Sequence, residues 1–295
     1  MPFFSVIIPA YNREKLIAAT LDSVFAQRFD DWEAIVVDDG STDRTVQIAE
    51  GYGPRVRVLR QKNAGPGAAR NAAAAVARGE YLAMLDSDDL WLPWALRTYR
   101  EAIDQTRRPA ILGGKLVHFR DVSELETVHE SIMDLQFYQD FLVAAANGAF
   151  IGAGQLCVRR DVFLAVGGFD VSVRTCEDHD FCLRAGEAAG CVVVKAPSMI
   201  GYRRHGESIT ESLDRKAEGI RHLVSNELRR RYPGGGPRAR ERWIAVTRHT
   251  RGFTFELLLA GRIVEATALF LQTLRWNARL GRAKYIIAFG GHVVA

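Results

Sequence analysis

The sequence predicts an α/β protein with a mostly parallel central sheet, helices on both faces and a C-terminal helical extension. Through residue 90, β-rich apolar runs alternate with helical patterns, and strands joined by helical crossovers run parallel. The chain has 295 residues, 48% of them hydrophobic, so it can bury a large core. The expected strands are 3–8, 32–38, 56–60 and 81–85, and the expected helices between them are 16–27, 45–50 and 68–77.

Polar or glycine-containing turns follow three of these strands. They read "PAYN" at 9–12, "DDGSTD" at 38–43 and "DSDD" at 86–89. In open α/β sheets, ligands bind beyond the carboxyl ends of the strands. We therefore expect the three turns to converge on one edge of the sheet.

The second part of the chain has a different pattern. Its apolar runs lie at 110–117, 150–158 and 191–194, with shorter helices between them. We expect these runs to continue the sheet and to cover the site. Residues 120–140 are acidic and weakly patterned, which predicts a mobile loop or a helical excursion.

After Thr210 the chain becomes helical. The segment "PGGGP" at 233–237 predicts a flexible linker. Residues 1–214 carry 23 basic and 30 acidic side chains, whereas 215–295 carry 16 basic and 5 acidic ones. The basic tail suits an anionic partner such as a membrane surface, and the alternative is a solvated helical face.

Composition narrows the class of protein further. The four cysteines, Cys157, Cys176, Cys182 and Cys191, form no C-x-x-C pair or zinc-finger spacing, which favours reduced thiols. No signal-peptide pattern opens the chain, and no apolar stretch reaches the ~18 residues of a spanning helix. These features predict a cytoplasmic protein.

The run "LDSDDLWLP" is the most informative motif. Asp86 and Asp88 are two residues apart, so on an extended backbone their carboxylates point to the same side, where a hard cation could hold a diphosphate. The alternative is a solvated turn in which Asp88 or Asp89 caps the following helix.

Two further segments suit ligand binding. In "DDGSTD", Asp38 or Asp39 could accept hydrogen bonds from a nucleobase or a ribose hydroxyl, or the segment could be an acidic capping turn. In "NAGPGAARNAA", Gly65 and Gly67 would let the backbone approach a ligand closely, and Arg70 in the first helical turn could reach a base or a phosphate.

Acids open an expected helix at "TCEDHDFCLR". Acids are favoured there by the helix dipole alone, but a fixed carboxylate could also act as a general base, and Asp178 is the candidate. In "YRRHGESIT", His205 could complete an oxygen-rich shell around Mn²⁺ or Mg²⁺, and Arg203 and Arg204 could neutralise a leaving diphosphate; the alternative is a basic surface loop.

Seven motifs, taken in their order along the chain, closely resemble those of the inverting family 2 glycosyltransferases of the GT-A fold. They are "SVIIPAYNRE", "VVDDGSTDRT", "NAGPGAARNAA", "LDSDDLWLP", "GGFD", "CEDHDFCLR" and "YRRHGESIT". The resemblance covers residues 5–210. It implies a catalytic domain at 1–214, with a nucleotide-binding half at 1–109 and an acceptor half at 110–214. Residues 215–295 form a helical region outside it.

The resemblance also implies roles for single residues. Asp178 would be the catalytic base with Glu177 as its neighbour, and Asp88 would ligate a divalent cation, with His205 as a second ligand. The donor would be bound by Pro9, Ala10, Tyr11, Asp38, Asp39, Asn63, Gly65, Arg70, Asp86 and Ser87.

The reaction expected from this resemblance is direct displacement by an acceptor hydroxyl. One sugar would move from a nucleotide-diphosphate sugar, with UDP as the expected nucleotide, to a glycan or a lipid-linked acceptor, as in the synthesis of surface polysaccharides. We expect no nucleic-acid partner. Residues 215–295 could contact the cytoplasmic face of a membrane or form a homo-oligomer.

Three other activities remain open. Transfer to a polyprenyl phosphate would suit the basic tail. A nucleotidyltransferase has a similar sheet and similar metal carboxylates, but "PAYNRE" is not its usual glycine-rich basic loop. A non-catalytic sugar-nucleotide binder would have no need of Asp178.

Overall fold

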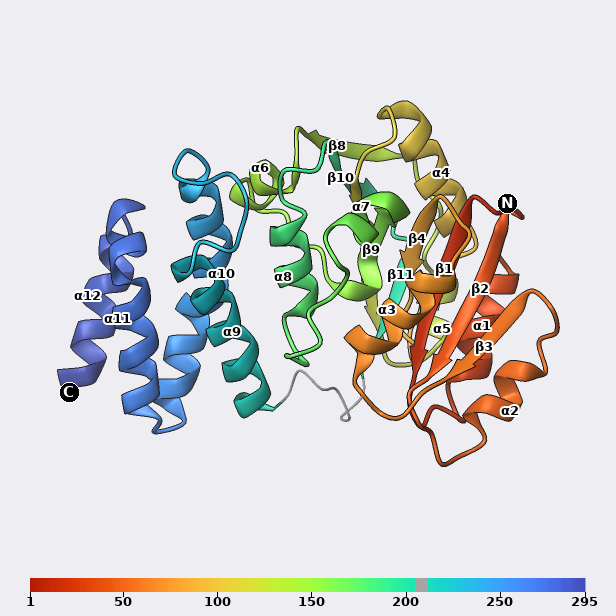
Figure 1. Cartoon of the computed structure of the whole chain (residues 1–295), viewed down its shortest axis with the longest axis horizontal. Helices are drawn as coiled ribbons and strands as arrows, with labels where there is room; N and C mark the ends of the chain where they lie inside the picture. Colours follow the sequence, from red (N-terminus) through yellow and green to blue (C-terminus); the bar gives the residue numbers. More distant parts are fainter. Residues whose placement is uncertain (205–211, 295) are drawn as a thin grey trace.

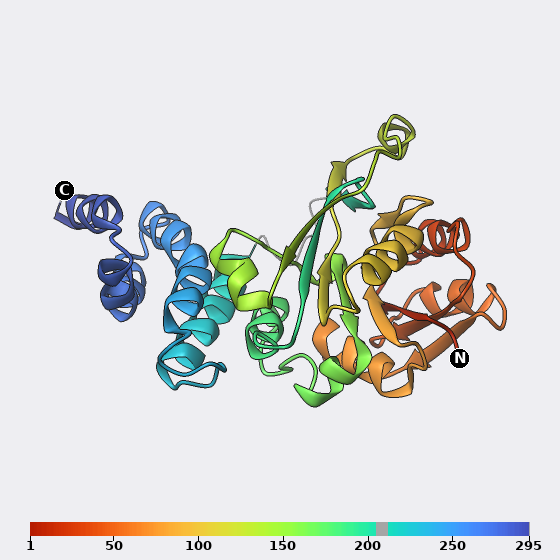
Figure 2. The same cartoon turned by 90° about the horizontal axis from the view of Figure 1, so that it is seen from above.

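The computed structural model describes residues 1–204 and 212–294 of the chain. The molecule is elongated, with the sheet at the N-terminal end and a group of helices at the C-terminal end (Figures 1 and 2). The two termini lie toward opposite ends of the long axis.

An eight-stranded sheet of order β3-β2-β1-β4-β9-β6-β10-β8 forms the centre of the fold. The parallel first half confirms the expectation from alternating strands and helices, because β1 pairs in parallel with β2 and β4, and β2 with β3. Its strands are β1 (Phe4–Ala10), β2 (Trp32–Asp38), β3 (Val56–Arg60), β4 (Tyr81–Met84), β6 (Ile111–Gly113), β8 (Asp134–Tyr138), β9 (Leu156–Arg159) and β10 (Cys191–Ala196).

Helices cover both faces of this sheet, as expected. Along β1, Val6 and Ile8 belong to one buried apolar cluster and Ile7 to another, because neighbouring side chains of a strand point to opposite faces. One cluster contains residues of α1 (Ile17–Phe25), α2 (Thr45–Glu50) and α4 (Ala95–Gln105). The other contains residues of α3 (Pro66–Val76), α6 (Phe141–Ala146), α7 (Arg160–Ala165) and α8 (Glu177–Arg184).

The second half of the sheet is mixed rather than parallel. Strand β9 runs antiparallel to both of its neighbours, β4 and β6. A separate three-stranded sheet of order β5-β11-β7 lies beside the main one. Its strands are β5 (Leu90–Trp91), β7 (Leu116–Phe119) and β11 (Ile200–Arg203).

The segment 120–140 contains the short helix α5 (Ser123–Glu126) and also strand β8, which the sequence did not predict. Strand β8 lies at the edge of the sheet and pairs only with β10, in antiparallel orientation. Three of its five side chains are exposed. An edge strand held by backbone hydrogen bonds needs no regular apolar pattern, so no sequence pattern marks β8.

The C-terminal helices share a core with the sheet. They are α9 (Leu213–Leu228), α10 (Ala239–Leu259), α11 (Ile263–Arg279) and α12 (Ala283–Val294). Leu223 of α9 and Val246 of α10 are fully buried and belong to the same apolar cluster as Phe181 of α8. The core therefore continues from the sheet into α9 and α10.

The segment 233–237 is a tight connection between α9 and α10 rather than a flexible linker. The buried Arg242 donates hydrogen bonds to both carboxylate oxygens of Glu227, at 2.8 and 3.3 Å, and to the carbonyl of Pro233 at 2.7 Å. Arg238 donates to both carboxylate oxygens of Asp140, at 2.8 and 2.9 Å. These bonds fix the connection against α9 and the start of α6.

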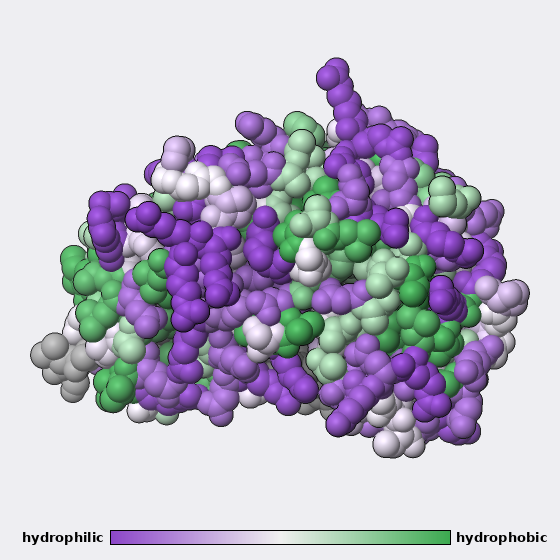
Figure 3. Space-filling view, viewed as in Figure 1, coloured by the Kyte–Doolittle hydropathy of each residue, from purple (hydrophilic) through white to green (hydrophobic). Residues whose placement is uncertain are grey.

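No helix in the described part of the chain is long and apolar enough to cross a membrane. All four cysteines are free thiols, and three of them are buried. On the face shown in Figure 3, hydrophilic side chains are interleaved with apolar ones, which gather near the end formed by α11 and α12 and also over the part of the molecule that contains the sheet.

Candidate active site

The turns that follow β1 and β2 are joined by hydrogen bonds. Asn12, which has a positive φ of 51°, donates its backbone N–H to the Ser41 hydroxyl at 2.9 Å. Its side-chain oxygen accepts the backbone N–H of Thr42 at 2.9 Å. The carboxyl ends of these two strands therefore meet at one edge of the sheet, as the sequence predicts.

Asp39 fixes the loop that follows β3. Its carboxylate accepts the backbone N–H groups of Ala64 and Gly65, both at 2.8 Å, and the side-chain N–H of Gln61 at 2.7 Å. Gly65 has φ 93°, a conformation that few other residues adopt. Asp39 is 4% exposed, and three of its approximately four acceptor positions are used, so about one remains for a ligand.

Arg70 lies beneath the site and joins two distant acids. Its guanidinium donates to Asp86 at 2.5 Å and to Glu177 at 3.1 Å. The Arg70 side chain is 4% exposed, and its Nε has no hydrogen-bond partner. Arg70 thus connects α3, the end of β4 and the start of α8.

Asp178 lies beside this pair and faces a glycine-containing turn. Its Oδ2 accepts the backbone N–H of Ala153 at 2.9 Å, in the short helix η1 (Ala153–Gln155). A Cβ atom on Gly152 would lie 3.6 Å from Asp178 Oδ2, and one on Gly154 would lie 3.0 Å from Asp86 Oδ2. The turn at 152–155 therefore lies against Asp86, which follows β4, and against Asp178 in α8.

The start of α8 has an unusual backbone. Cys176, immediately before the helix, has φ 59°, which is costly for a residue with a side chain. This conformation begins the helix at Glu177 and directs Glu177 to Arg70 and Asp178 to the turn at 152–155. The sequence shows the acids of this helix, but the backbone conformation that aims them is not visible in it.

Three acids at this edge, of which Asp89 and Glu177 are buried, have raised pKa values. Burial raises the pKa of Glu177 to about 7, and the neighbouring Asp178 adds to the effect despite Arg70. Burial and then Asp86 raise the pKa of Asp89 to about 9. Burial raises the pKa of Asp86 against the attraction of Arg70, and Asp88 adds to it. Several carboxyl groups with shifted pKa values lie close together here, which is typical of a functional site.

Asp178 behaves differently from these three acids. Burial alone would raise its pKa, but His179 and the N–H groups of His179 and Ala153 outweigh burial and place the pKa below its ordinary value. Asp178 is therefore ionised at neutral pH and able to accept a proton.

Asp88 is the expected metal ligand. Its carboxylate lies 3.3 Å from the guanidinium of Arg13, and both side chains are 20% exposed. Arg203 donates its Nε–H to the Asp88 carbonyl and its backbone N–H to Asp89 Oδ1, both at 2.9 Å. The second expected ligand, His205, lies outside the described residues.

The carboxylate oxygens of Asp88 are suitable ligands for a hard cation. Mg²⁺ is usually bound by one or two carboxylates together with the phosphates of a substrate, and Mn²⁺ also accepts oxygen ligands. Asp88 offers one partly exposed carboxylate beside Asp86, so it could hold such an ion together with a bound diphosphate.

The other expected donor-binding residues lie along the same edge. Pro9 and Ala10 end β1, and the Ala10 carbonyl accepts the Asp39 N–H at 2.8 Å. Tyr11 is 47% exposed and Asn63 is exposed, whereas Asp38 and Ser87 are buried.

A second acidic group lies on the other side of α8. Asp170, Asp180 and His222 bring ligand atoms within 4.8 Å of one another. Asp180 is fully buried and accepts hydrogen bonds from Arg184 at 2.6 Å, Asn226 at 2.8 Å and Tyr232 at 3.0 Å. These bonds tie α9 to α8 and leave little room for a cation.

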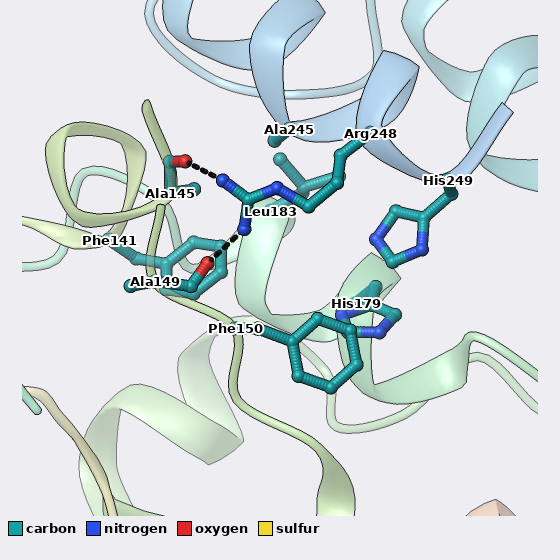
Figure 4. A pocket seen from close by; sticks show the side chains of 9 residues that line it. All are labelled: Phe141, Ala145, Ala149, Phe150, His179, Leu183, Ala245, Arg248 and His249. Atoms are coloured by element: carbon teal, nitrogen blue, oxygen red, sulfur yellow. Dashed lines mark hydrogen bonds between the residues drawn. The ribbon is translucent and has the colours of Figure 1, made fainter. Parts of the chain in front are cut away.

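A small cavity lies between α6, α8 and α10, and His179, the residue after Asp178, is among the residues that line it (Figure 4). Arg248 of α10 closes it by donating hydrogen bonds to the carbonyls of Ala145 and Ala149, and the rings of Phe150, His179 and His249 lie together at its rim. No sequence motif marks Phe150, His249, the turn at 152–155 or Arg13 as part of a site. Only the apolar run 150–158 indicated that this segment enters the fold.

A wider hollow is lined by residues 30–34 and 54–57. It lies at the amino ends of β2 and β3, whereas ligands of such sheets bind at the carboxyl ends.

Residues 5–166, more than half of the chain, match the sequence profile of glycosyl transferase family 2. The chain is 30% identical over 241 residues to chondroitin synthase of Escherichia coli, a match that covers 78% of this chain and 33% of that protein. It is 29% identical over 218 residues to poly(ribitol-phosphate) beta-N-acetylglucosaminyltransferase TarS of Staphylococcus aureus, covering 71% of this chain and 37% of TarS. The chain spans 33% to 64% of the length of the curated relatives it matches first.

Solved structures show the same fold. The TarS 1-349 fragment in complex with UDP-GlcNAc has a TM-score of 0.73 at 24% identity, covering 98% of this chain and 89% of that one. The mannosyltransferase PcManGT from Pyrobaculum calidifontis, in complex with GDP-Man and Mn²⁺, has a TM-score of 0.55 at 18% identity, covering 99% and 85%. The expected α/β architecture with a C-terminal helical region is confirmed.

Proposed function

Since the chain belongs to glycosyl transferase family 2, we propose that it moves one sugar from a nucleotide-diphosphate sugar to an acceptor hydroxyl, with inversion at the anomeric carbon. This proposal rests on one observation. Arg70 donates hydrogen bonds to Asp86 and Glu177, and the turn at 152–155 donates one to Asp178. These contacts place an ionised carboxylate beside a group of acids at the carboxyl ends of the strands.

In this reaction, Asp178 accepts the proton of the acceptor hydroxyl. The acceptor oxygen attacks the anomeric carbon from the face opposite the diphosphate, and the bond to the diphosphate oxygen breaks with its electron pair. Each Asp178 oxygen already accepts one backbone N–H, from Ala153 or His179, and keeps a second acceptor position for this proton. A positioned carboxylate of this kind typically contributes about 10²- to 10⁴-fold.

The negative charge of the leaving diphosphate needs a cation. Asp88 would hold Mn²⁺ or Mg²⁺, with His205 as a second ligand, and the ion would act as a Lewis acid on the leaving group. Arg13 and Arg203 lie beside Asp88 and add positive charge on the protein side. The Mn²⁺ bound by the Pyrobaculum mannosyltransferase supports this assignment.

The donor would lie along the edge formed by Pro9 to Tyr11, Asp38, Asp39 and the loop at 63–65. We propose UDP as its nucleotide, because the related TarS fragment was solved with UDP-GlcNAc. The names of the relatives, chondroitin synthase and a poly(ribitol-phosphate) glycosyltransferase, support an acceptor in surface or wall polysaccharide synthesis. We include a lipid-linked acceptor in this proposal.

A panel of sugar nucleotides tests this function. We expect UDP release from at least one UDP-sugar, dependent on Mn²⁺ or Mg²⁺ and lost after treatment with a chelator. Release of pyrophosphate instead of UDP would favour a nucleotidyltransferase, and binding of UDP-sugar without any turnover would favour a non-catalytic binder. Efficient transfer to polyprenyl phosphate would favour the lipid-phosphate reaction.

Residues 215–295 suit a surface partner. They combine a strong excess of basic residues with exposed apolar side chains, among them Leu259 at 88%, Val264 at 83% and Ile287 at 74% exposure. We propose contact with an anionic membrane at its cytoplasmic face, and the competing proposal is a homo-oligomer. Sedimentation with anionic liposomes distinguishes the two, because an oligomer would change mass without pelleting.

A further inference from the structure

Phe150 lies beside the expected base and stays open to solvent. It is 51% exposed, and a Cβ atom on Gly152 would lie 3.9 Å from the Phe150 ring and 3.6 Å from Asp178 Oδ2. A single exposed aromatic residue is common on protein surfaces and needs no explanation by itself. The contacts around Phe150 make it unusual.

Two other rings support Phe150 from behind. The ring of His179 lies 4.4 Å from the Phe150 ring, and the ring of His249 lies 5.9 Å from it, both measured between centroids. The two histidine rings are 4.3 Å apart. The three rings therefore form one packed group, with Phe150 on its outer side (Figure 4).

The same group reaches Asp178. The backbone N–H of His179 donates to Asp178 Oδ1 at 2.8 Å, and His179 Nε2 lies 3.9 Å from that oxygen. The supporting ring and the expected base are thus neighbours on α8, so the position of Phe150 relative to the base is fixed.

Helix α10 holds this group in place from the C-terminal region. Arg248 donates hydrogen bonds to the carbonyls of Gly148 at 3.0 Å and Ala149 at 2.8 Å, the two residues before Phe150. Gly148 has φ 100°, which bends the chain at this point. Burial, and after it His179, lower the pKa of His249 to about 3, so its ring is neutral and packs without charge.

We propose that Phe150 is a stacking platform for the ring of an acceptor sugar, and that Arg248 and His249 are positioning residues that hold the platform beside Asp178. One face of a pyranose carries mainly C–H groups and packs on an aromatic ring, while the hydroxyls at its edge stay available for reaction. Helix α10 then contributes to acceptor choice, a role outside the part of the chain that matches the family. This inference rests on the proposed function.

The test compares ring and open-chain acceptors. UDP release is measured with Mn²⁺ and the best UDP-sugar donor, using methyl pyranosides as ring acceptors and ribitol as the acyclic one. We expect Phe150→Ala to raise the KM for the best pyranoside about tenfold and to leave the KM for ribitol unchanged within about twofold, because only the ring loses its stacking surface. Phe150→Tyr, which keeps the ring, should restore the wild-type KM.

Matched controls separate stacking from general damage. Phe137→Ala removes an aromatic side chain of similar exposure, 55%, from edge strand β8, and we expect it to leave the pyranoside KM unchanged. Calorimetry should give the same Kd for the donor in Phe150→Ala as in the wild type. The melting temperature of each variant shows that it is folded.

His249 is tested by its own pair of variants. We expect His249→Ala to raise the pyranoside KM about threefold or more, and His249→Phe, which keeps a neutral ring, to bring it back. Equal defects in both variants would overturn the positioning role of His249.

The outcomes distinguish this inference from the proposed function. If the wild type turns over UDP-sugars but Phe150→Ala leaves the pyranoside KM unchanged, the platform is wrong and the function stands. If Phe150→Ala raises the KM for pyranosides and ribitol equally, Phe150 does not select rings and the inference is again wrong. If the wild type releases no UDP from any donor, both the inference about Phe150 and the proposed function are wrong.

Discussion

Two groups of acidic residues include side chains of helix α8. They contain the same residue types but serve different purposes. At the N-terminus of the helix, Glu177 and Asp178 face Asp86 across Arg70, and two of the acids at this edge, Glu177 and Asp89, have pKa values raised to about 7 and about 9. Within the helix, Asp180 faces α9 and is surrounded by hydrogen-bond donors.

The difference lies in how well each charge is compensated. Asp180 has enough donors to stabilise its buried charge, so the fold benefits from it. The acids around Arg70 lie close together and have raised pKa values, so ionising them costs free energy at the place where a substrate and a metal ion would bind. Charge that costs stability is typical of functional sites.

Replacing Asp178 should have the largest effect on activity. We expect Asp178→Asn to lower kcat at least about 10²-fold, because the amide cannot accept the acceptor proton. The Kd for the donor and the melting temperature should stay near their wild-type values. Steady-state kinetics and calorimetry measure both, and turnover like that of the wild type would remove Asp178 from the mechanism.

Replacing Asp180, two residues along the same helix, should lower stability and leave kcat nearly unchanged. Asp180→Ala leaves Arg184, Asn226 and Tyr232 without their acceptor, which should cost about 3 kcal/mol of stability and lower the melting temperature by about 6 to 10 °C. The kcat of the folded fraction should change little. A large fall in kcat with unchanged stability would mean that the two groups do not differ as described.

Replacing Asp88 should affect metal-dependent binding. We expect Asp88→Ala to weaken the binding of UDP by about tenfold or more in the presence of Mn²⁺ and to have little effect in its absence, because the carboxylate acts through the ion. Calorimetry with and without Mn²⁺ measures this. Asp31→Ala, an exposed acid at the amino end of β2, serves as the control.

The smallest expected effect is on stability as a function of pH. The pKa of Glu177 is raised from 4.5 to about 7, so the folded state favours the protonated form. The corresponding stability is complete below about pH 4.5 and is lost as the pH rises through about 7.

Glu177→Gln removes this titration. Its melting temperature should equal that of the wild type near pH 4.5 and exceed it by about 1 to 3 °C at pH 8, although its activity falls. Thermal unfolding at the two pH values is the measurement. A variant that is less stable than the wild type at pH 8 would show that the charge of Glu177 stabilises the fold.

The sequence predicted the parallel half of the sheet, and it indicated the edge at which we propose the site. Alternating apolar runs and helical patterns determine strands, helices and parallel pairing locally, and the turns after β1, β2 and β4 follow from strand order. The sequence also indicated most of the acids, because Asp86, Asp88 and Asp178 stand at recognisable element ends.

What the sequence could not show is which distant groups meet. Arg70 was expected at a base or a phosphate, but its guanidinium lies under the site and joins acids of two other elements. The antiparallel entry of β9 brings the turn at 152–155 to Asp178, and α10 reaches the same place from the end of the chain.

Local residue patterns thus determined the helices, the parallel strands and the acidic strand ends of this protein. The tertiary structure decided which carboxyl groups are paired with cations and donors and which are not, and it decided that helix α10 borders the candidate site. The physical reason is that periodicity and turn chemistry depend on neighbours along the chain, whereas charge pairing and ring packing depend on neighbours in space.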